Sequence, residues 1–419
     1  MERYQELLKN KIYESCQLMT REPSGILTHP YMVPSSPDSP FYAMSLWDWD
    51  SWFISLVLGQ IEADTKQPGR FMEYEQGSIL NFIDHTDEQG HMPIHLDENG
   101  ALYRSHKNRR ADIENMHKPV IAQHVALLFQ RSHCLDWIQP YFPVIEKFLN
   151  RYLTVFYHEE TGLVFWQDDF AVGVDNDPSV FYRPEKSCAS IFLNSLLYRE
   201  LLAFGYLMER SGQADRAAYW RSEAQKLAEA IKQFCWDERD GTFYSADLAL
   251  RPIDPSDWLH KGAPRHWPCL LLRIDSWSSF LPLWAGLATQ EQAVRMVGHY
   301  RDNQTFNAQF GVRTLSRLEK MYSLHASNNP SNWLGPVWGI SNYLVFSGLV
   351  KYGFADDARD LARKTIFLFG RDLEKTGTLH EYYHPDTGDP IMTPGFQNWN
   401  DLVLNMIAYL EGRKMVECF

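Results

Sequence analysis

The chain has 419 residues, of which 40 are Lys or Arg and 53 are Asp or Glu, so its formal net charge is −13. An acidic excess disfavours nucleic acid or an anionic membrane as a partner, because both are bound by positive patches. Aromatic residues make up 14% of the chain, which is more than packing alone usually needs. The length allows a large core, and this composition favours a small neutral or weakly charged ligand.

Six cysteines are scattered along the chain without the CxxC spacing of a metal site. We therefore expect free, mostly buried thiols in a reducing compartment. The first residues lack the basic and then apolar pattern of a signal peptide, and no apolar run is long enough for a membrane span. The sequence predicts a cytoplasmic protein with no membrane partner.

Helical patterns recur from one end of the chain to the other. Residues 188–208 are apolar almost throughout, which predicts a helix buried on more than one side. Thr289 and Gln292 resemble a capping box that opens a helix over 291–300. Two further helices are predicted from apolar residues at spacings of three and four, namely Trp220, Ala224, Leu227, Ile231 and Phe234 in one and Ala358, Leu361, Ala362, Thr365 and Phe369 in the other.

Long connections rich in aromatic residues, Gly and Pro separate the helices. Loops of this length in a compact protein are usually functional or disordered, and their Trp, Tyr and His content argues against disorder. Neither a repeat nor a linker divides the chain, so we expect one all-α domain over 1–419 whose loops converge on one face. The loops span 21–45, 84–118, 161–187, 251–276, 323–339 and 380–399.

Four segments combine polar groups with large aromatic residues. "SLWDWDSWF" (45–53) has tryptophans that can stack on a sugar ring and carboxylates that can bind its hydroxyls. "GVDNDPSVFYRP" (173–184) sets two acids and an amide before a proline, "LHEYYHPDTGDP" (379–390) carries Glu381, and "NWLGPVWGISNYLV" (332–345) carries two tryptophans. The alternatives without a ligand are, respectively, a helix start, an Asx turn, a hairpin arm and a packed helix entry.

Hydrolysis of a glycosidic bond requires an acid to protonate the leaving oxygen and a carboxylate to activate water. Asp175 and Glu381 could supply this pair. They are 206 residues apart in the chain (381 minus 175), so only a closed fold could bring them together. Asp177 is a competitor for the acid role, or a neighbour whose charge raises the pKa of Asp175.

The motifs LWDWDSWF, GVDNDPSVFYRP, FLPLWAGLAT, NWLGPVWGISNYL and HEYYHPDTG resemble, as an ordered set from about residue 45 to 410, those of glycoside hydrolase family 63, with the trehalase family as a relative. The resemblance implies an all-α (α/α)6 toroid and hydrolysis of α-glycosidic bonds with inversion. It assigns Asp175 as general acid, Glu381 as general base, and Trp49 and Asp50 to the glycosyl subsite. The other expected substrate contacts are Trp47, Gln123, Arg183, Trp333, Gly335, Trp338, Tyr382 and Trp399.

The leading expectation is an exo-acting, inverting α-glycosidase on a small α-glucoside or α-mannoside, such as a glucosylglycerate, a mannosylglycerate or a short glucosyl disaccharide, with no cofactor. Inversion requires the two carboxyl groups to stand about 6.5–9.5 Å apart, with room for a water molecule. An anionic glycerate would need basic partners near the pocket mouth, although each candidate could equally be ordinary surface charge. The candidates are Arg104, Lys107, Arg109, Arg110 and Arg183.

Other classes of function stay open at this stage. They are a trehalase-like hydrolase, a sugar epimerase or lyase on the same helical toroid, and a sugar-binding protein without catalysis. An epimerase or lyase would need a base such as His91, His95, His380 or His384. A metal site at His91, His95 and Asp97 is disfavoured, because Pro93 breaks the helix that would align the ligands. The sequence does not determine the glycosyl unit, the aglycone or the oligomeric state.

Overall fold

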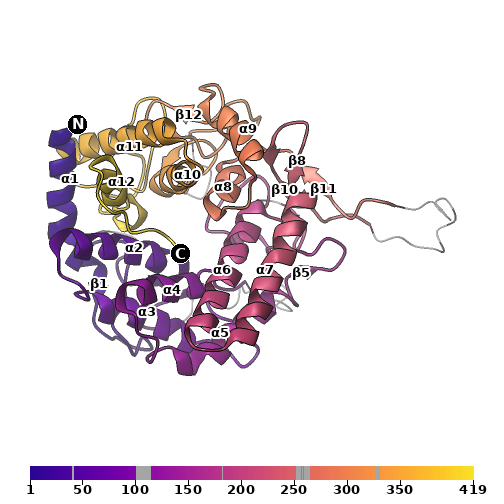
Figure 1. Cartoon of the computed structure of the whole chain (residues 1–419). Coiled ribbons are helices and arrows are strands. Elements are labelled where there is room, and N and C mark those ends of the chain that lie inside the picture. Colours follow the sequence, from indigo (N-terminus) through magenta and orange to yellow (C-terminus); the bar gives the residue numbers. More distant parts are fainter. Residues whose placement is uncertain are drawn as a thin grey trace.

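The computed structural model describes residues 1–39, 42–100, 115–181, 183–251, 256, 258, 265–325 and 331–419. Its α-helices form two concentric rings, with inner and outer helices alternating along the chain (Figure 1). The inner helices are α2 (Asp48–Thr65), α4 (Ile121–Ser132), α6 (Ile191–Arg210), α8 (Leu281–Ala285), α10 (Gly339–Lys351) and α12 (Val403–Leu410). The outer helices are α1 (Glu2–Ser15), α3 (Met72–Asp84), α5 (Phe142–Tyr152), α7 (Ala214–Phe234), α9 (Gln290–Arg301) and α11 (Ala355–Thr376).

The inner ring is closed. Each inner helix packs against the next one along the chain, and α12 packs against α2. Outer helices cover it, with α3 on α4, α7 on α6, and α11 on α10 and α12. The chain is therefore the predicted all-α (α/α)6 toroid.

Burial follows the position of each helix in the two layers. Every residue of α2 from Asp48 to Glu62 is buried, because an inner helix is covered both by its ring neighbours and by the outer layer. The predicted apolar helix α6 is buried in the same way over most of its length. In α7 and α11, the predicted stripes are buried except for Phe234, which is half-buried, and the opposite faces are exposed.

Each of the six long loops leads into an inner helix, so that the loops gather at the amino-terminal ends of these helices. Short antiparallel ladders tie them together, as where Trp47 pairs with His95 and Trp338 with Tyr382. The strands are β1 (Thr20–Arg21), β2 (Tyr31–Met32), β3 (Leu46–Trp47), β4 (His95–Leu96), β5 (Tyr157–His158), β6 (Leu163–Val164), β7 (Cys188–Ala189), β8 (Trp236–Asp237), β9 (Thr242–Phe243), β10 (Ser245–Asp247), β11 (Leu270–Leu272), β12 (Asn307–Ala308), β13 (Gly311–Val312), β14 (Val337–Trp338) and β15 (Tyr382–Tyr383). Short 3₁₀ helices are η1 (Cys16–Met19), η2 (Gln139–Tyr141), η3 (Asp169–Ala171), η4 (Trp277–Phe280) and η5 (Asn398–Asn400).

The carboxyl-terminal end of the chain lies inside the ring (Figure 1). Gln60, near the end of α2, accepts a hydrogen bond from the backbone N–H of Val416 at 2.8 Å. The ring of Phe419 lies 5.0 Å from that of Tyr206, near the end of α6. The last residues thus contact the carboxyl-terminal ends of inner helices, opposite to the ends where the loops gather.

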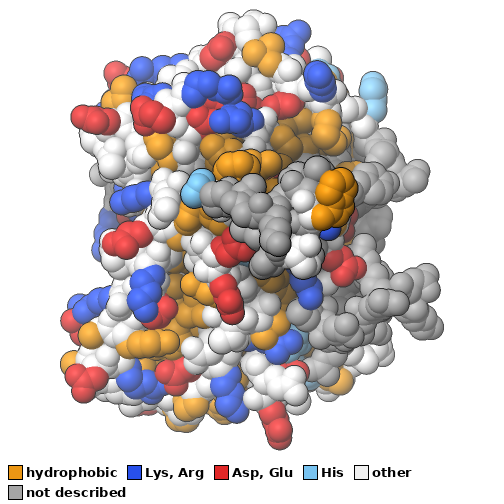
Figure 2. Space-filling view, turned by 90° about the vertical axis from the view of Figure 1, so that its right-hand side faces the viewer, with side chains coloured by type: hydrophobic (Ala, Val, Ile, Leu, Met, Phe, Trp, Pro, Cys, Tyr) orange, Lys and Arg blue, Asp and Glu red, His pale blue; other side chains and the backbone are white. Residues whose placement is uncertain are grey.

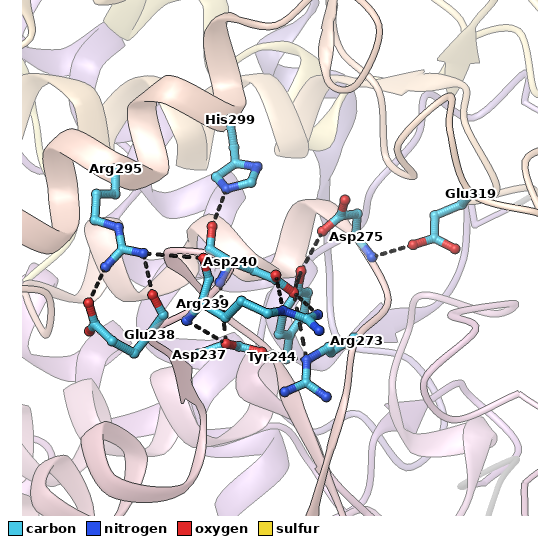
Figure 3. Close-up of polar contacts among 10 residues, drawn as sticks. All are labelled: Asp237, Glu238, Arg239, Asp240, Tyr244, Arg273, Asp275, Arg295, His299 and Glu319. Carbon is cyan, nitrogen blue, oxygen red and sulfur yellow. Dashed lines mark hydrogen bonds and ion pairs between the residues drawn. The ribbon is translucent and has the colours of Figure 1, made fainter.

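A polar network holds the β8–β9 turn, helix α9 and the end of the 251–276 loop together (Figure 3). Asp240 accepts hydrogen bonds from Arg239 and Tyr244, and its carbonyl oxygen lies 2.6 Å from Nε2 of His299 on α9. Tyr244 also donates to Asp275 at 3.0 Å. The network fixes the point at which the loop turns towards α8.

The outer surface carries charges of both signs. On the face shown in Figure 2, the described basic and acidic side chains are interspersed, without an extended positive patch. None of the helices in the described ranges is long and apolar enough to cross a bilayer. All six cysteines are unpaired, and Cys16, Cys188, Cys235 and Cys269 are buried.

The predicted capping box at the start of α9 is confirmed, since Thr289 accepts from the N–H of Gln292 and Gln292 accepts from the N–H of Thr289. We expect Thr289→Ala to lower the free energy of unfolding by about 1 kcal/mol, because one helix donor loses its partner. Urea denaturation measures this change. Thr289→Ser keeps the hydroxyl and is the control, and equal stability of the two variants would contradict a role for the cap.

Candidate active site

A cavity of about 390 Å³ lies where the loops converge, and its described lining residues come from five of the six long loops, from β3 and from the first turn of α2. Its size is in the usual range for small-molecule sites. The lining residues are Tyr42, Trp47, Trp49, Asp50, Ile94, Lys118, Asp169, Phe170, Gly173, Asp175, Phe181, Ser331, Trp333, Trp338, Glu381, Phe396 and Trp399. Asp175 and Glu381, far apart in the chain, thus line one cavity.

Glu381 is buried and held by two hydroxyl groups. Thr393 Oγ1 donates to Oε2 at 2.5 Å, and the Tyr42 hydroxyl donates to Oε1 at 3.4 Å. Burial raises the pKa of Glu381 to about 7, and the nearby charge of Asp175 acts in the same direction against the two hydroxyl donors. The carboxyl group is therefore oriented, and it changes protonation state near neutral pH.

The acids and the amide of the 173–184 loop have separate positions. Asp175 is half-buried and lines the cavity. Asn176 is buried, accepts from the N–H of Trp333 at 2.7 Å and donates to Asn332 at 3.1 Å, so it joins two loops. Asp177 is buried and accepts from the N–H and the hydroxyl of Ser179. One motif therefore supplies both the residues that hold the loop, Asn176 and Asp177, and the acid that lines the cavity, Asp175.

The tryptophan-rich wall is a stack of parallel rings. Trp338 lies 3.8 Å from Trp333 and 4.7 Å from Tyr382, with interplanar angles of 11° and 16°. Trp277, just before α8, stacks on the other side of Trp333 at 5.9 Å. Since Trp333 and Trp338 line the cavity and their ring faces are covered by neighbouring rings, the stack forms a rigid aromatic part of the cavity wall.

A buried ion pair supports the part of the cavity wall that Trp49 and Lys118 form. Lys118 Nζ donates to both carboxylate oxygens of Asp48 at 3.2 Å, and it lies 4.8 Å from the ring centre of Trp49. Asp48 also accepts from the N–H groups of Lys118 and Trp49. The ion pair between Lys118 and Asp48 fixes the loop before α4 against the start of α2. Both Trp49 and Lys118 line the cavity, so this contact holds part of its wall in place.

Asp50 lines the cavity one turn into α2 and accepts a hydrogen bond from the side-chain amide of Asn398. Burial raises the pKa of Asp50 to about 8, and the charge of Asp48 adds to the rise while Lys118 opposes it. Near neutral pH the carboxyl group is therefore largely protonated, so that it can donate a hydrogen bond as well as accept one.

The structure explains why the GVDNDPSVFYRP motif begins with a glycine, Gly173. Its φ of +71° is in the left-handed region, and a Cβ there would lie 2.9 Å from Cε of Lys118 and 3.0 Å from Trp49. A side chain at this position would push against the supporting wall. The glycine lets the loop approach the ion pair closely.

Four expected substrate contacts do not line this cavity. Gln123 is buried and donates to the carbonyl oxygens of Pro119 and Leu196, which joins α4 to α6. Arg183 pairs with Asp247 at 2.7 Å. Gly335 leaves room for the ring of Tyr322, which would lie 2.4 Å from a Cβ, and Tyr382 is covered by Trp338.

Other sequence candidates lie away from the cavity or outside the described residues. Arg104, Lys107, Arg109 and Arg110, proposed for an anionic aglycone, lie outside the described residues, as does Tyr182. In the described part of the chain, no His, Cys, Asp or Glu residues are grouped as a metal site. His91 lies 2.9 Å from the carbonyl oxygen of Asn115, and His95 packs on Trp47 at 4.4 Å.

Several site residues were not singled out from the sequence. Tyr42 and Thr393 give no motif signal, since a single hydroxyl in a loop is common. Lys118 lies in "HKPVIAQHV", the segment that also contains Gln123, and a lysine before a proline and a buried helix is a signal for a buried partner. The other cavity-lining residues not assigned to the site beforehand are Ile94, Asp169, Phe170, Gly173, Phe181, Ser331 and Phe396.

The family model described as "Mannosylglycerate hydrolase MGH1-like glycoside hydrolase domain" matches residues 43–399. A probable trehalase of Eremothecium gossypii is 28% identical over 283 residues, which is 61% of this chain and 34% of that protein. Mannosylglycerate hydrolase MGH1 of Selaginella moellendorffii is 23% identical over 414 residues, which is 85% of this chain and 78% of that protein. The chain spans about a third of the length of this trehalase and of a cytosolic neutral trehalase of Kluyveromyces lactis.

Among solved structures, the GH63 mannosylglycerate hydrolase from Thermus thermophilus in complex with glucose superimposes with a TM-score of 0.67 at 20% identity. The match covers 95% of this chain and 99% of that one. It shows a shared fold.

Breaking the buried ion pair between Lys118 and Asp48 should have a large effect on stability. Lys118→Met should lower the free energy of unfolding by about 3–5 kcal/mol, because Asp48 is left buried and unpaired. Adding Asp48→Asn should restore much of the loss by removing that charge. Urea unfolding of both single variants and the double variant gives the coupling energy, and strictly additive losses would contradict the pairing.

Proposed function

The chain belongs to the family of mannosylglycerate hydrolase MGH1-like glycoside hydrolase domains, and we propose that it is an exo-acting, inverting α-glycosidase that hydrolyses a small α-glucoside or α-mannoside. The observation that carries the proposal is the common cavity of Asp175 and Glu381, walled by aromatic rings. A pair of carboxyl groups facing a sugar-sized space is what inverting hydrolysis requires.

In the proposed mechanism Asp175 is the general acid and donates its proton to the glycosidic oxygen as the bond to C1 breaks. Glu381 is the general base and removes a proton from a water molecule, which attacks C1 from the other side. The Tyr42 and Thr393 hydroxyls hold the Glu381 carboxylate in one orientation. Attack from the opposite face turns an α-glycoside into a β-sugar.

The glycosyl unit is proposed to lie between the two aromatic walls. Trp49 and Trp399, whose rings are 5.5 Å apart, form one part of the cavity, and Trp333 and Trp338 form another. Asp50, being largely protonated, can donate to one sugar hydroxyl and accept from a second. Aromatic walls and paired hydroxyl contacts suit a neutral pyranose.

The aglycone is less narrowly defined. Among the described lining residues, Lys118 is the only cation, and it is paired with Asp48. Arg183 pairs with Asp247, and the other candidate partners for a glycerate carboxylate, Arg104, Lys107, Arg109 and Arg110, lie outside the described residues. We propose glucosylglycerate, mannosylglycerate and short glucosyl disaccharides as the candidates, with trehalose as the alternative suggested by the trehalase relatives.

An epimerase or lyase is less well supported. None of His91, His95, His380 and His384 is among the described residues that line the cavity, and a C–H base would have to reach the sugar. Loss of the acid–base pair would favour a sugar-binding protein without catalysis, and both carboxyl groups are present in this chain. Unpaired thiols suit a reducing compartment, so we propose a cytoplasmic location.

Proton NMR of the purified protein with a panel of α-glucosides and α-mannosides tests the activity. We expect early release of the β-anomer from at least one of glucosylglycerate, mannosylglycerate and trehalose, because water attacks opposite the leaving group. Chelation should leave the rate unchanged. Release of the α-anomer first, or no release from any substrate, would overturn the proposal.

The proposed roles of the two carboxyl groups predict how much activity is lost when each is substituted. Asp175→Asn and Glu381→Gln should each lower kcat by about 10²–10⁴-fold, since each removes one proton-transfer step. Asp177→Asn is the matched control from the same motif and should keep most of the activity, because Asp177 bonds to Ser179 and does not line the cavity. A larger loss in Asp177→Asn than in Asp175→Asn would reassign the acid.

The pH dependence follows from the raised pKa of Glu381. A general base must be deprotonated, so kcat/KM should fall as the pH drops below about 7. Thr393→Val removes a donor that stabilises the carboxylate, and should move this acidic limb to higher pH, whereas Thr393→Ser should not. If Thr393→Val instead moves a limb on which activity falls above pH 7, Glu381 acts as the acid and the roles are reversed.

A further inference from the structure

The chain on either side of Glu381 is held by residues that do not reach the cavity. Glu381 lies between His380, one of the histidines noted in the sequence, and strand β15, which contains Tyr383. His380 is half-buried and Tyr383 is buried, and neither is among the described residues that line the cavity. The partners of these two residues show what fixes the proposed general base.

His380 is held at three separate atoms. Its backbone N–H donates to the hydroxyl of Tyr383 at 2.9 Å, and its carbonyl oxygen accepts from the side-chain amide of Asn400 in η5 at 2.7 Å. Its ring nitrogen Nδ1 lies 2.9 Å from Oδ2 of Asp372 on the outer helix α11. The residue directly before Glu381 is therefore fixed by contacts with α11, β15 and the loop before α12.

Asp372 is the common anchor of this network. It is buried, and the same Oδ2 also accepts a hydrogen bond from the Tyr383 hydroxyl at 2.9 Å. Its other carboxyl oxygen accepts from the Thr376 hydroxyl at 3.1 Å. One oxygen atom thus joins His380, which precedes Glu381, to Tyr383, which follows it by two residues. Because these contacts are buried, loss of this acceptor would leave the Tyr383 hydroxyl without its partner.

The position of this segment decides whether Glu381 meets its hydroxyl donor. The N–H of Glu381 donates to the carbonyl oxygen of Met392 at 2.9 Å, and Thr393, the next residue, donates to its carboxylate at 2.5 Å. Thr393 has a φ of +47°, a left-handed conformation that β-branched residues rarely adopt and that persists only where the surroundings fix it. Both bonds therefore depend on one alignment of residues 380–383 with residues 392 and 393.

We propose that Asp372 is a positioning residue of the glycosidase, which acts from the outer layer of helices, through the two residues it binds on either side of Glu381, to align that carboxylate. The inference rests on the proposed role of Glu381 as general base. A general base has to lie at the right distance from the attacking water, and a displacement of about 1 Å can lower the rate by about 10²-fold. Asp372 is not among the described residues that line the cavity, so its effect on the reaction is exerted through the residues that flank the base.

The alignment is measured without relying on catalysis, in crystal structures of the unmodified protein and of Asp372→Ala. We expect the variant to lose the hydrogen bond between Thr393 and Glu381, because the residues that flank Glu381 no longer share an acceptor. Tyr13→Phe is the matched control. It removes another tyrosine–aspartate hydrogen bond, of 2.8 Å to Asp64 near the end of α2, and should leave the bond to Glu381 intact.

The effect on the reaction is measured on the α-glycoside that the protein hydrolyses. Asp372→Ala should lower kcat by about 10–10²-fold at unchanged KM, because the base moves while the residues that bind the sugar stay in place. Asp372→Asn should recover most of this loss, since its amide oxygen can still accept from Tyr383 and His380. Tyr13→Phe should keep kcat. A purely structural role would lower the melting temperature of Asp372→Ala without this split between kcat and KM.

Tyr383→Phe removes one of the contacts to Asp372 without removing a charge, and it replaces Asp372→Ala in both experiments if the melting temperature shows that this variant is unfolded. An intact bond between Thr393 and Glu381 in the folded variant, or an unchanged kcat, would overturn the positioning role. Absence of glycosidase activity in the unmodified protein would contradict the proposed function alone, because the crystal structures still decide whether Asp372 aligns Glu381.

Discussion

Closure of the inner ring between α12 and α2 is the constraint on which the site depends. The two helices lie at opposite ends of the chain, and their packing brings the loop before α12 against the first turn of α2. Asn398 can then donate to Asp50, and Trp399 can pack on Trp49 at 5.5 Å. Because every inner helix follows a long loop, closing the ring also gathers the other loops at the same end. The cavity is therefore a property of the closed ring, and no single hairpin contains it.

Several acids lie in or beside the cavity, where their charges would repel one another. Each of them has different hydrogen-bond or ion-pair partners. Asp48 is paired with Lys118 and stays out of the cavity. Asp50 has an amide donor and a pKa raised to about 8 by burial, which makes it largely neutral. Glu381 has hydroxyl donors that oppose the effect of burial, so its pKa reaches only about 7. The three buried carboxyl groups thus have different surroundings: Asp48 is held in an ion pair, whereas burial raises the pKa values of Asp50 and Glu381 to about 8 and about 7.

Much of this arrangement could be predicted, because several site residues lie in short sequence motifs that are recognisable on their own. A tryptophan next to an acid at a helix start, or an acid run before a proline, keeps its chemistry wherever the ring places it, so the segments around Asp50 and Asp175 were recognisable from the sequence. Tyr42, Thr393 and Lys118 act only through partners distant in the chain, and their own sequence neighbourhoods are ordinary. Gln123 and Arg183 show the converse. Each stands near a motif, yet one joins α4 to α6 and the other pairs with Asp247. A polar side chain in such a loop can serve packing as readily as binding.

The loop of residues 173–184 shows why a motif locates a site more securely than it assigns roles within it. Asp175, Asn176 and Asp177 have similar side chains, and all three suit an Asx turn. In the fold they point to three different surroundings. Asp177 is enclosed with Ser179, and Asn176 bonds across to the loop that carries Trp333, so neither carboxyl nor amide there is available to a substrate. Asp175 alone of the three lines the cavity. Access to the cavity, which the turn and its anchoring residues decide, therefore favours Asp175 over Asp177 as the acid.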